Sequence, residues 1–177
     1  MSGWLVIAGL GPGADGLVTP EVRAALAEAT DVVGYIPYVA RVAPRPGLTL
    51  HPSDNRVEID RSRHALEMAA DGRRVVVVSS GDPGVFAMAS AVFEALEAGP
   101  PAWRDLEIRV LPGITAMLAA AARAGAQAFV HVSAIAAAPE GGTETEYAAA
   151  TKMGEDRVLA AFPKATVLRP SILFGKD

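Results

Sequence analysis

The sequence predicts an α/β fold, with a single doubly wound, mostly parallel sheet of about seven strands and helices on both faces. Three observations predict it. Short apolar runs alternate with stretches of helical period almost throughout the 177 residues. Several of these runs are unbroken Val, Ile and Leu, which is typical of parallel strands buried on both faces. The strand–helix–strand order implies parallel pairing through right-handed crossovers.

The strands are predicted where short apolar runs end at glycine, proline or serine. The first run, beginning at Trp4, leads directly into a glycine-rich turn, and the valine-rich run at 75–79 leads into another. The segment 36–53 is the least regular, because four prolines interrupt any period. The expected strands are Trp4–Ala8, Asp31–Val33, Leu48–His51, Val75–Ser79, Glu107–Leu111, Ala128–Ser133 and Ala165–Arg169.

The helices are predicted between these strands, and their ends carry capping signals. Thr19 is suited to cap the first helix, and Pro20 suits its first helical position. Asp54 or Asn55 is suited to cap the helix that follows them, whereas Gly72 and Gly99 lie where helices should end. The expected helices are 20–29, about 57–70, 85–98, 114–124 and 146–161.

Length and composition are those of one compact domain, 1–177. Apolar residues make up 51% of the chain, which is enough for a core without staples. The net charge of −4 offers no basic surface for nucleic acid. The absence of cysteine excludes disulfides and thiol chemistry, and no signal peptide or membrane span is recognised. These features predict a cytoplasmic protein that binds a small molecule at most.

The first glycine-rich turn, GLGPGA at 9–14, formally fits the dinucleotide pattern G-x-G-x-x-G/A. Three features argue against NAD. Pro12 removes one main-chain N–H that a pyrophosphate needs. The following helix is expected to begin only at Pro20, and no Asp or Glu closes the second strand to bind a ribose. A tight strand–helix turn is the alternative, and no NAD binding is expected.

Residues 1 to about 126 carry an ordered series of motifs: the opening GLGPG with Thr19, Gly34-Tyr35 with Tyr38-Val39, SDNRVEIDRSR at 53–63, GDPGVFAMA at 81–89 and PGITA at 112–116. In this order they resemble the tetrapyrrole methylases, and among them the precorrin-3B C17-methyltransferases. The resemblance implies the N-terminal domain of an enzyme that methylates a corrin precursor of cobalamin with S-adenosylmethionine.

The resemblance also implies a site, which would lie at the carboxyl ends of strands, where open α/β sheets bind ligands. Asp82 is alternatively a turn residue or helix cap, and Phe86 a core residue. In the family the site lies between two domains; only the first is recognised here, so the implied S-adenosylmethionine binding is weak. The implied cofactor residues are Gly81, Asp82, Pro83, Gly84, Phe86, Thr115 and Ala116, and the implied substrate loop is Gly11, Pro12 and Gly13.

Residues of about 127–177 carry other motifs, QAFVHVSAI at 127–135 and FPKATVLRPSILFG at 162–175. They resemble the late Rossmann section of extended or atypical short-chain dehydrogenases, and among these most of all the epimerase-like proteins related to an accessory subunit of respiratory complex I. Ser133 and Tyr147 fall where that family has catalytic residues. Lys152 is five residues after the tyrosine instead of four, which turns it off the shared helix face. These three positions are therefore interpreted as vestigial, and dehydrogenase activity is not expected.

Together, the two resemblances predict an engineered chimera, joined near Gly125–Ala126, whose second segment completes one Rossmann-like sheet. Natural fusions join whole domains at exposed linkers, and none is visible here. No catalytic residue is assigned, and no metal site is expected, because cysteine is absent and the histidines at 51, 64 and 131 stand apart. The alternative is a truncated or divergent precorrin-3B C17-methyltransferase of cobalamin biosynthesis that uses S-adenosylmethionine.

Overall fold

The computed structural model describes residues 3–85, 87–125, 130–132, 155–156, 158–160, 164 and 166–168. The chain divides into two compact units, Met1–Ala119 and Ala120–Asp177, each described by itself below. Within the described part, no helix has the combination of length and apolar character that crossing a bilayer requires.

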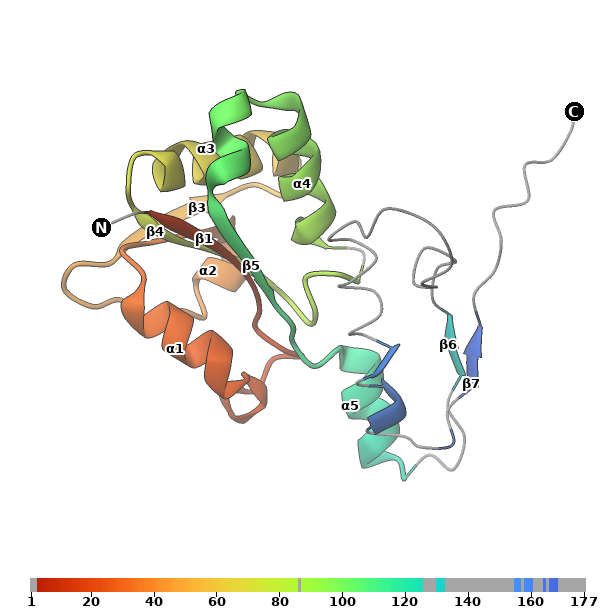
Figure 1. Ribbon diagram of the computed structural model, residues 1–177. Coiled ribbons are helices and arrows are strands. Elements are labelled where there is room, and N and C mark those ends of the chain that lie inside the picture. Colours follow the sequence, from red (N-terminus) through yellow and green to blue (C-terminus); the bar gives the residue numbers. More distant parts are fainter. Residues whose placement is uncertain are drawn as a thin grey trace, which may run out of the picture. The chain divides into compact units, whose positions relative to one another are not determined.

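The first unit is built on a five-stranded, all-parallel sheet in the order β3-β2-β4-β1-β5 (Figure 1). β1 is central: Trp4 is in register with Arg74 on one side and with Glu107 on the other. The strands are β1 (Trp4–Gly9), β2 (Asp31–Tyr35), β3 (Thr49–Ser53), β4 (Arg74–Ser79) and β5 (Glu107–Leu111).

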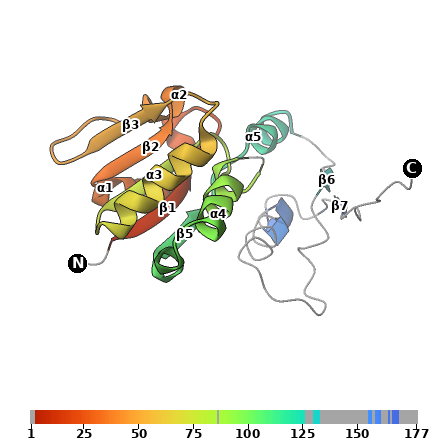
Figure 2. The same ribbon diagram turned by 90° about the horizontal axis from the view of Figure 1, so that it is seen from above.

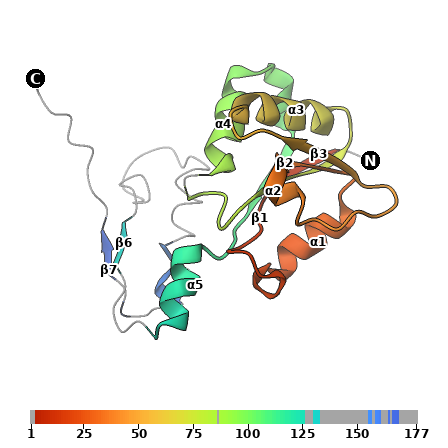
Figure 3. The ribbon, with the colours of Figure 1, turned by 180° about the vertical axis from the view of Figure 1, so that it is seen from behind.

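Helices cover both faces of this sheet, so the doubly wound arrangement predicted from the sequence is confirmed. Helices α3 and α4 lie on one face and α1 and α2 on the other (Figures 1 and 3), and the view from above places α3 and α4 along the strands (Figure 2). The helices are α1 (Pro20–Glu28), α2 (Ile36–Val39), α3 (Glu58–Ala70), α4 (Met88–Ala98) and α5 (Ala116–Arg123), with 3-10 turns η1 (Asp15–Leu17) and η2 (Pro101–Asp105).

The valine-rich run of β4 is buried on both faces. Val75 and Val77 pack into the cluster beneath α3 and α4, and Val76 and Val78 pack into the cluster beneath α1 and α2. All four side chains are fully buried. A strand between two helical layers has no solvent face, which explains why its sequence lacks polar alternation.

Several predicted helix ends are confirmed and one is wrong. The Val22 amide donates to Thr19 Oγ1 at 3.4 Å, and Gly72 ends α3 with φ +86°. Neither Asp54 nor Asn55 caps α3, because that helix begins at Glu58, with Val57 at the cap position, and the Asp54 carboxylate instead accepts from the Asn55 amide at 2.5 Å. The proline-interrupted segment still forms a strand, because β3 is at the edge of the sheet, where a missing N–H is tolerated.

The second unit contributes β6 (Val130–Val132) and β7 (Thr166–Leu168), which pair in parallel with each other. Among the described residues these two strands form a separate sheet, so the expected single sheet of seven strands is corrected to five strands and a pair. The apolar runs predict where the strands lie. They do not predict which strands pair, because pairing depends on contacts between residues distant in sequence. That all 177 residues form one domain stays a prediction, which clean proteolysis near residue 126 into two stable fragments would contradict.

Candidate functional site

Three turns lie side by side at the carboxyl edge of the sheet, because they follow the neighbouring strands β4, β1 and β5. The turns after β1 and β4 are joined by two backbone bonds: Gly11 N donates to Gly81 O at 3.2 Å, and Gly81 N donates to Gly11 O at 3.0 Å. Leu10 N donates to Ser79 O at 2.8 Å. The sheet's hydrogen bonding therefore continues past the strand ends, at the edge where open α/β sheets bind ligands.

Glycine is required at this edge because the turns touch through their backbones. A Cβ added to Gly113 would lie 1.9 Å from Gly81 O and 2.8 Å from Gly9 O. A Cβ added to Gly9 would lie 2.4 Å from Gly81 O. Gly81 differs: its φ is +59°, and an added Cβ would meet nothing closer than Thr115 Cα, at 3.7 Å. One side of Gly81 is thus open, whereas Gly9 and Gly113 are enclosed.

Asp82 takes the turn role that the sequence left open. Its Oδ1 accepts from Gly84 N at 2.8 Å, and its Oδ2 accepts from Gly113 N at 3.1 Å. Pro83 is buried, and its carbonyl accepts from Ala89 N at 3.0 Å. Phe86, which the resemblance also assigned to the cofactor, lies outside the described residues.

The other predicted cofactor residues begin helix α5. Thr115 Oγ1 accepts from Leu118 N at 3.2 Å, which caps the helix. Ala116 is the first helical residue and is exposed. Because the open side of Gly81 faces Thr115, the structure brings the predicted residues of the β4 and β5 turns together.

The predicted substrate loop is held by an arginine that the sequence analysis missed. Arg41 donates from Nη2 to Leu10 O at 2.6 Å and from Nη1 to Gly11 O at 3.3 Å. Pro12 is half-buried and Gly13 exposed, so the tip of the loop is accessible. No sequence signal marked Arg41, which follows a four-residue helix in the segment interrupted by prolines.

Four exposed apolar side chains lie in the segments that follow the carboxyl ends of four strands, and we name this set the apolar rim: Leu17, Ile36, Val85 and Met117. They follow β1, β2, β4 and β5 respectively and are 37–55% exposed. Scattered exposed apolar residues need no explanation, but four at one edge point to a partner or ligand. Only Leu17 and Val85 directly follow a glycine, so no common sequence signal marked the four residues.

A buried cation connects two elements near this edge. Arg61 donates from Nε to Ser53 Oγ at 2.7 Å, from Nη2 to Asp54 O at 2.5 Å and from Nη1 to Met88 Sδ at 3.3 Å. Burial lowers the pKa of Arg61, and the nearby charges of Glu58 and Asp54 oppose that shift. The guanidinium thus ties the end of β3 to the first residue of α4.

A polar cluster centres on Asp31, the first residue of β2, where the side chain is 3% exposed. Asp31 accepts from Arg73 Nη1 at 3.0 Å and from Thr30 Oγ1 at 2.7 Å, and it lies 2.8 Å from His51 Nε2. Burial alone would raise the pKa of Asp31. The hydrogen bonds from His51, Thr30 and Arg73, with the charge of Arg73, outweigh burial and lower this pKa. The cluster is at the amino edge of the sheet, away from the turns.

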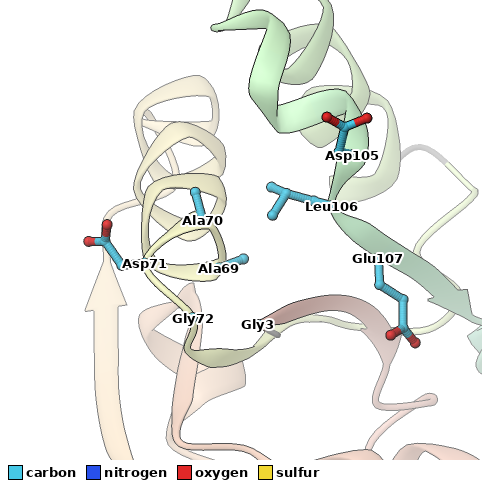
Figure 4. A pocket seen from close by; sticks show the side chains of 8 residues that line it. All are labelled: Gly3, Ala69, Ala70, Asp71, Gly72, Asp105, Leu106 and Glu107. Atoms are coloured by element: carbon cyan, nitrogen blue, oxygen red, sulfur yellow. The ribbon is translucent and has the colours of Figure 1, made fainter. Parts of the chain in front are cut away.

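A cavity of about 510 Å³ also opens at the amino edge, lined by Gly3, Ala69, Ala70, Asp71, Gly72, Asp105, Leu106 and Glu107. Figure 4 shows Ala69 and Leu106 bordering the hollow, whereas the carboxylates of Asp71, Asp105 and Glu107 point away from one another. Across the described ranges, no group of three His, Cys, Asp or Glu side chains is placed to hold a metal ion. This cavity therefore does not form a cation site.

A family model for tetrapyrrole (corrin/porphyrin) methylases matches residues 4–168. The chain belongs to the tetrapyrrole methylase family. The precorrin-3B C(17)-methyltransferase of Sinorhizobium sp is 51% identical over 126 residues, which are 71% of this chain and 50% of that protein. The cobalamin biosynthesis protein CobIJ of Mycobacterium bovis is 49% identical over 126 residues, which are 71% of this chain and 24% of that protein.

Solved structures agree with the tetrapyrrole methylase assignment. The crystal structure of the methyltransferase CobJ matches with a TM-score of 0.69 and 75% identity, over 73% of this chain and 56% of that one. The uroporphyrin-III-C-methyltransferase of Thermus thermophilus, at 22% identity and a TM-score of 0.56 over 75% of this chain and 61% of that one, shares the fold. The chain spans about half the length of the curated methyltransferase and of the CobJ chain.

The interpretation of the chain as an engineered chimera is wrong. The tetrapyrrole methylase model continues through residues 125–126, where a join was placed, as far as residue 168. These comparisons give no support to a dehydrogenase-like segment, and Ser133, Tyr147 and Lys152 lie outside the described residues. The alternative, a methyltransferase related to the precorrin-3B C17 enzymes, agrees with the matches. The expectation of no NAD binding stays a prediction; α1 does begin at Pro20, well past the glycines.

Proposed function

We propose that this chain carries the cofactor-binding part of an S-adenosylmethionine-dependent methyltransferase that acts at C17 of a precorrin, in the biosynthesis of cobalamin. One observation carries the proposal: the 51% identity with a precorrin-3B C(17)-methyltransferase, over 71% of this chain. The position of the three turns at the carboxyl edge of the sheet, where open α/β sheets bind ligands, supports the proposal.

The open side of Gly81 supports this assignment. The open side of Gly81 faces Thr115, so a ligand can approach the backbone of the β4 turn from the direction of the β5 turn. Residues 81–84 and 115–116 would hold the cofactor, chiefly through main-chain groups, and Phe86 is assigned there by resemblance. When bound, S-adenosylmethionine supplies a methyl group on a positively charged sulfur.

The protein's own part in the reaction is binding and orientation. Methyl transfer depends on aligning donor and acceptor, and holding both in place accelerates a two-reactant step strongly. The apolar rim would pack against the apolar parts of the tetrapyrrole and exclude water. The tip of the substrate loop, Pro12 and Gly13, would contact the same ligand, with Arg41 holding the loop in position.

Calorimetric titration with S-adenosylhomocysteine tests the proposal. We expect saturable binding by the unaltered chain and at least about a tenfold loss in Gly81→Val, since the branched side chain fills the open side. Gly47→Val is the matched control. Gly47 also has a positive φ, +78°, and an added Cβ would meet nothing within 4 Å, so backbone strain is reproduced away from the site.

Other outcomes would contradict it. Binding that survives Gly81→Val unchanged would place the site elsewhere, and absence of binding by the unaltered chain would remove the cofactor assignment. NADH added in place of S-adenosylhomocysteine should give no saturable signal. Incubation with precorrin-3B and S-adenosylmethionine should add the mass of one methyl group to the tetrapyrrole.

A further inference from the structure

Asp82 joins two turns whose strands do not pair. Its carboxylate accepts from Gly84 N in its own turn and from Gly113 N in the turn after β5. In the sheet, β1 lies between β4 and β5. The Asp82–Gly113 bond therefore passes over the end of β1 and connects turns that no strand ladder connects directly.

The two turns also contact each other directly through their backbones, with no side chain between them. Gly113 lies so close to Gly81 O that even a methyl group would not fit between them. A hydrogen bond to a charged acceptor is shorter and stronger than one between neutral groups. The Asp82 carboxylate thus holds the β5 turn against the β4 turn while the backbone contact limits how near it can come.

We propose that Asp82 is a positioning residue, which sets the separation of the 81–84 and 112–116 segments and acts on the cofactor through them. This inference rests on the proposed function, since those segments are the two sides of the proposed cofactor site. It assigns to Asp82 a role different from the direct cofactor contact that the family resemblance implied.

The substitution Asp82→Asn keeps the shape of the side chain but removes its ability to accept both hydrogen bonds. The carboxylate has two accepting oxygens, whereas an amide has one, and its NH₂ group would face the N–H of Gly84 or Gly113. Asp82→Ser serves if Asp82→Asn does not fold, because its hydroxyl can close the turn to Gly84 but is too short to reach Gly113.

The first measurement needs no ligand. NMR hydrogen exchange at the Gly113 amide should be at least about tenfold faster in Asp82→Asn than in the unaltered chain. The exposed Asp105, at the amino edge, gives the control Asp105→Asn, in which this rate should not change. An unchanged Gly113 rate in both Asp82 variants would overturn the bridge, whatever the protein binds.

The second measurement is the dissociation constant for S-adenosylhomocysteine, which should rise about tenfold in Asp82→Asn. Asp31→Asn controls for a general loss of stability: it should weaken the fold yet leave affinity and Gly113 exchange unchanged. Faster Gly113 exchange with affinity within about twofold of the unaltered chain would overturn the positioning role. If the unaltered chain binds no S-adenosylhomocysteine, the proposed function fails and the positioning role with it, while Gly113 exchange still decides whether the bridge exists.

Discussion

Gly113→Ala is expected to destabilise the five-stranded unit by about 3 kcal/mol, at the upper end of what overpacking costs. The added Cβ would lie 1.9 Å from Gly81 O and 2.8 Å from Gly9 O. Both neighbours are backbone atoms, and Gly81 O also accepts a hydrogen bond from Gly11 N, so neither can move aside as the end of a flexible side chain could. Urea unfolding followed by circular dichroism would measure the loss, as a lower midpoint at an unchanged slope.

Gly16→Ala is the matched control for that experiment. An added Cβ at Gly16 meets nothing within 4 Å and its φ is not positive, so stability should change by less than about 0.5 kcal/mol. If Gly113→Ala unfolded at the same urea concentration as the unaltered chain, the three turns could not be packed as described.

Asp31→Ala is expected to cost about 2 kcal/mol, because it removes a buried carboxylate that accepts several hydrogen bonds. The loss stays below that of a fully buried ion pair, since the side chains of Arg73 and His51 are 51% and 24% exposed. Urea unfolding at neutral pH would measure it. Asp105→Asn, at an exposed aspartate, should change stability by less than about 0.5 kcal/mol.

The contribution of Asp31 should depend on pH in a defined direction. The pKa of Asp31 is lower in the folded chain than its ordinary value of 3.8. The stabilisation is therefore full above that ordinary value and is lost as the pH falls through the lowered folded-state pKa. The difference in unfolding free energy between the unaltered chain and Asp31→Ala should accordingly shrink below about pH 4. A difference that stayed constant down to about pH 2 would contradict the lowered pKa.

The strands of the first unit were predictable because burial on both faces leaves a direct mark on the sequence. The Val75–Val78 run could be assigned from composition alone, and its surroundings in the structure explain why. The strand at 49–53 was predicted only as 48–51, because Pro52 interrupts the apolar pattern; an edge strand tolerates that proline. The pairing of β6 with β7 could not be predicted in this way, because a short apolar run can pair with any neighbouring strand.

The sequence could predict that the turns after β4 and β5 lie close together, but not which contacts their residues make. The turns after β4 and β5 do meet. The two glycines in them differ, however, because Gly113 is packed against backbone atoms whereas Gly81 has an open side. The sequence shows a glycine at both positions and cannot distinguish these surroundings. The neighbours of Asp82 in the sequence indicate a turn residue. Its bond to Gly113 could not be predicted from them, because Gly113 is 31 positions further along the chain. The chimera interpretation erred by weighing a resemblance of about fifty residues above the continuity of the whole chain with one family.

The central place of β1 has a consequence for how the chain acquires its fold during synthesis. Trp4 pairs with Arg74 on one side and Glu107 on the other, so the first strand emerges long before either partner exists. At about 5–20 residues per second, the roughly 70 residues between Trp4 and Arg74 take about 4–14 seconds to translate. Throughout that interval residues 4–8 have no partner strand, because the strands that pair with β1 are β4 and β5. We therefore expect nascent chains that end before β4 to be the ones that bind chaperones, and chains that extend past β5 to be released.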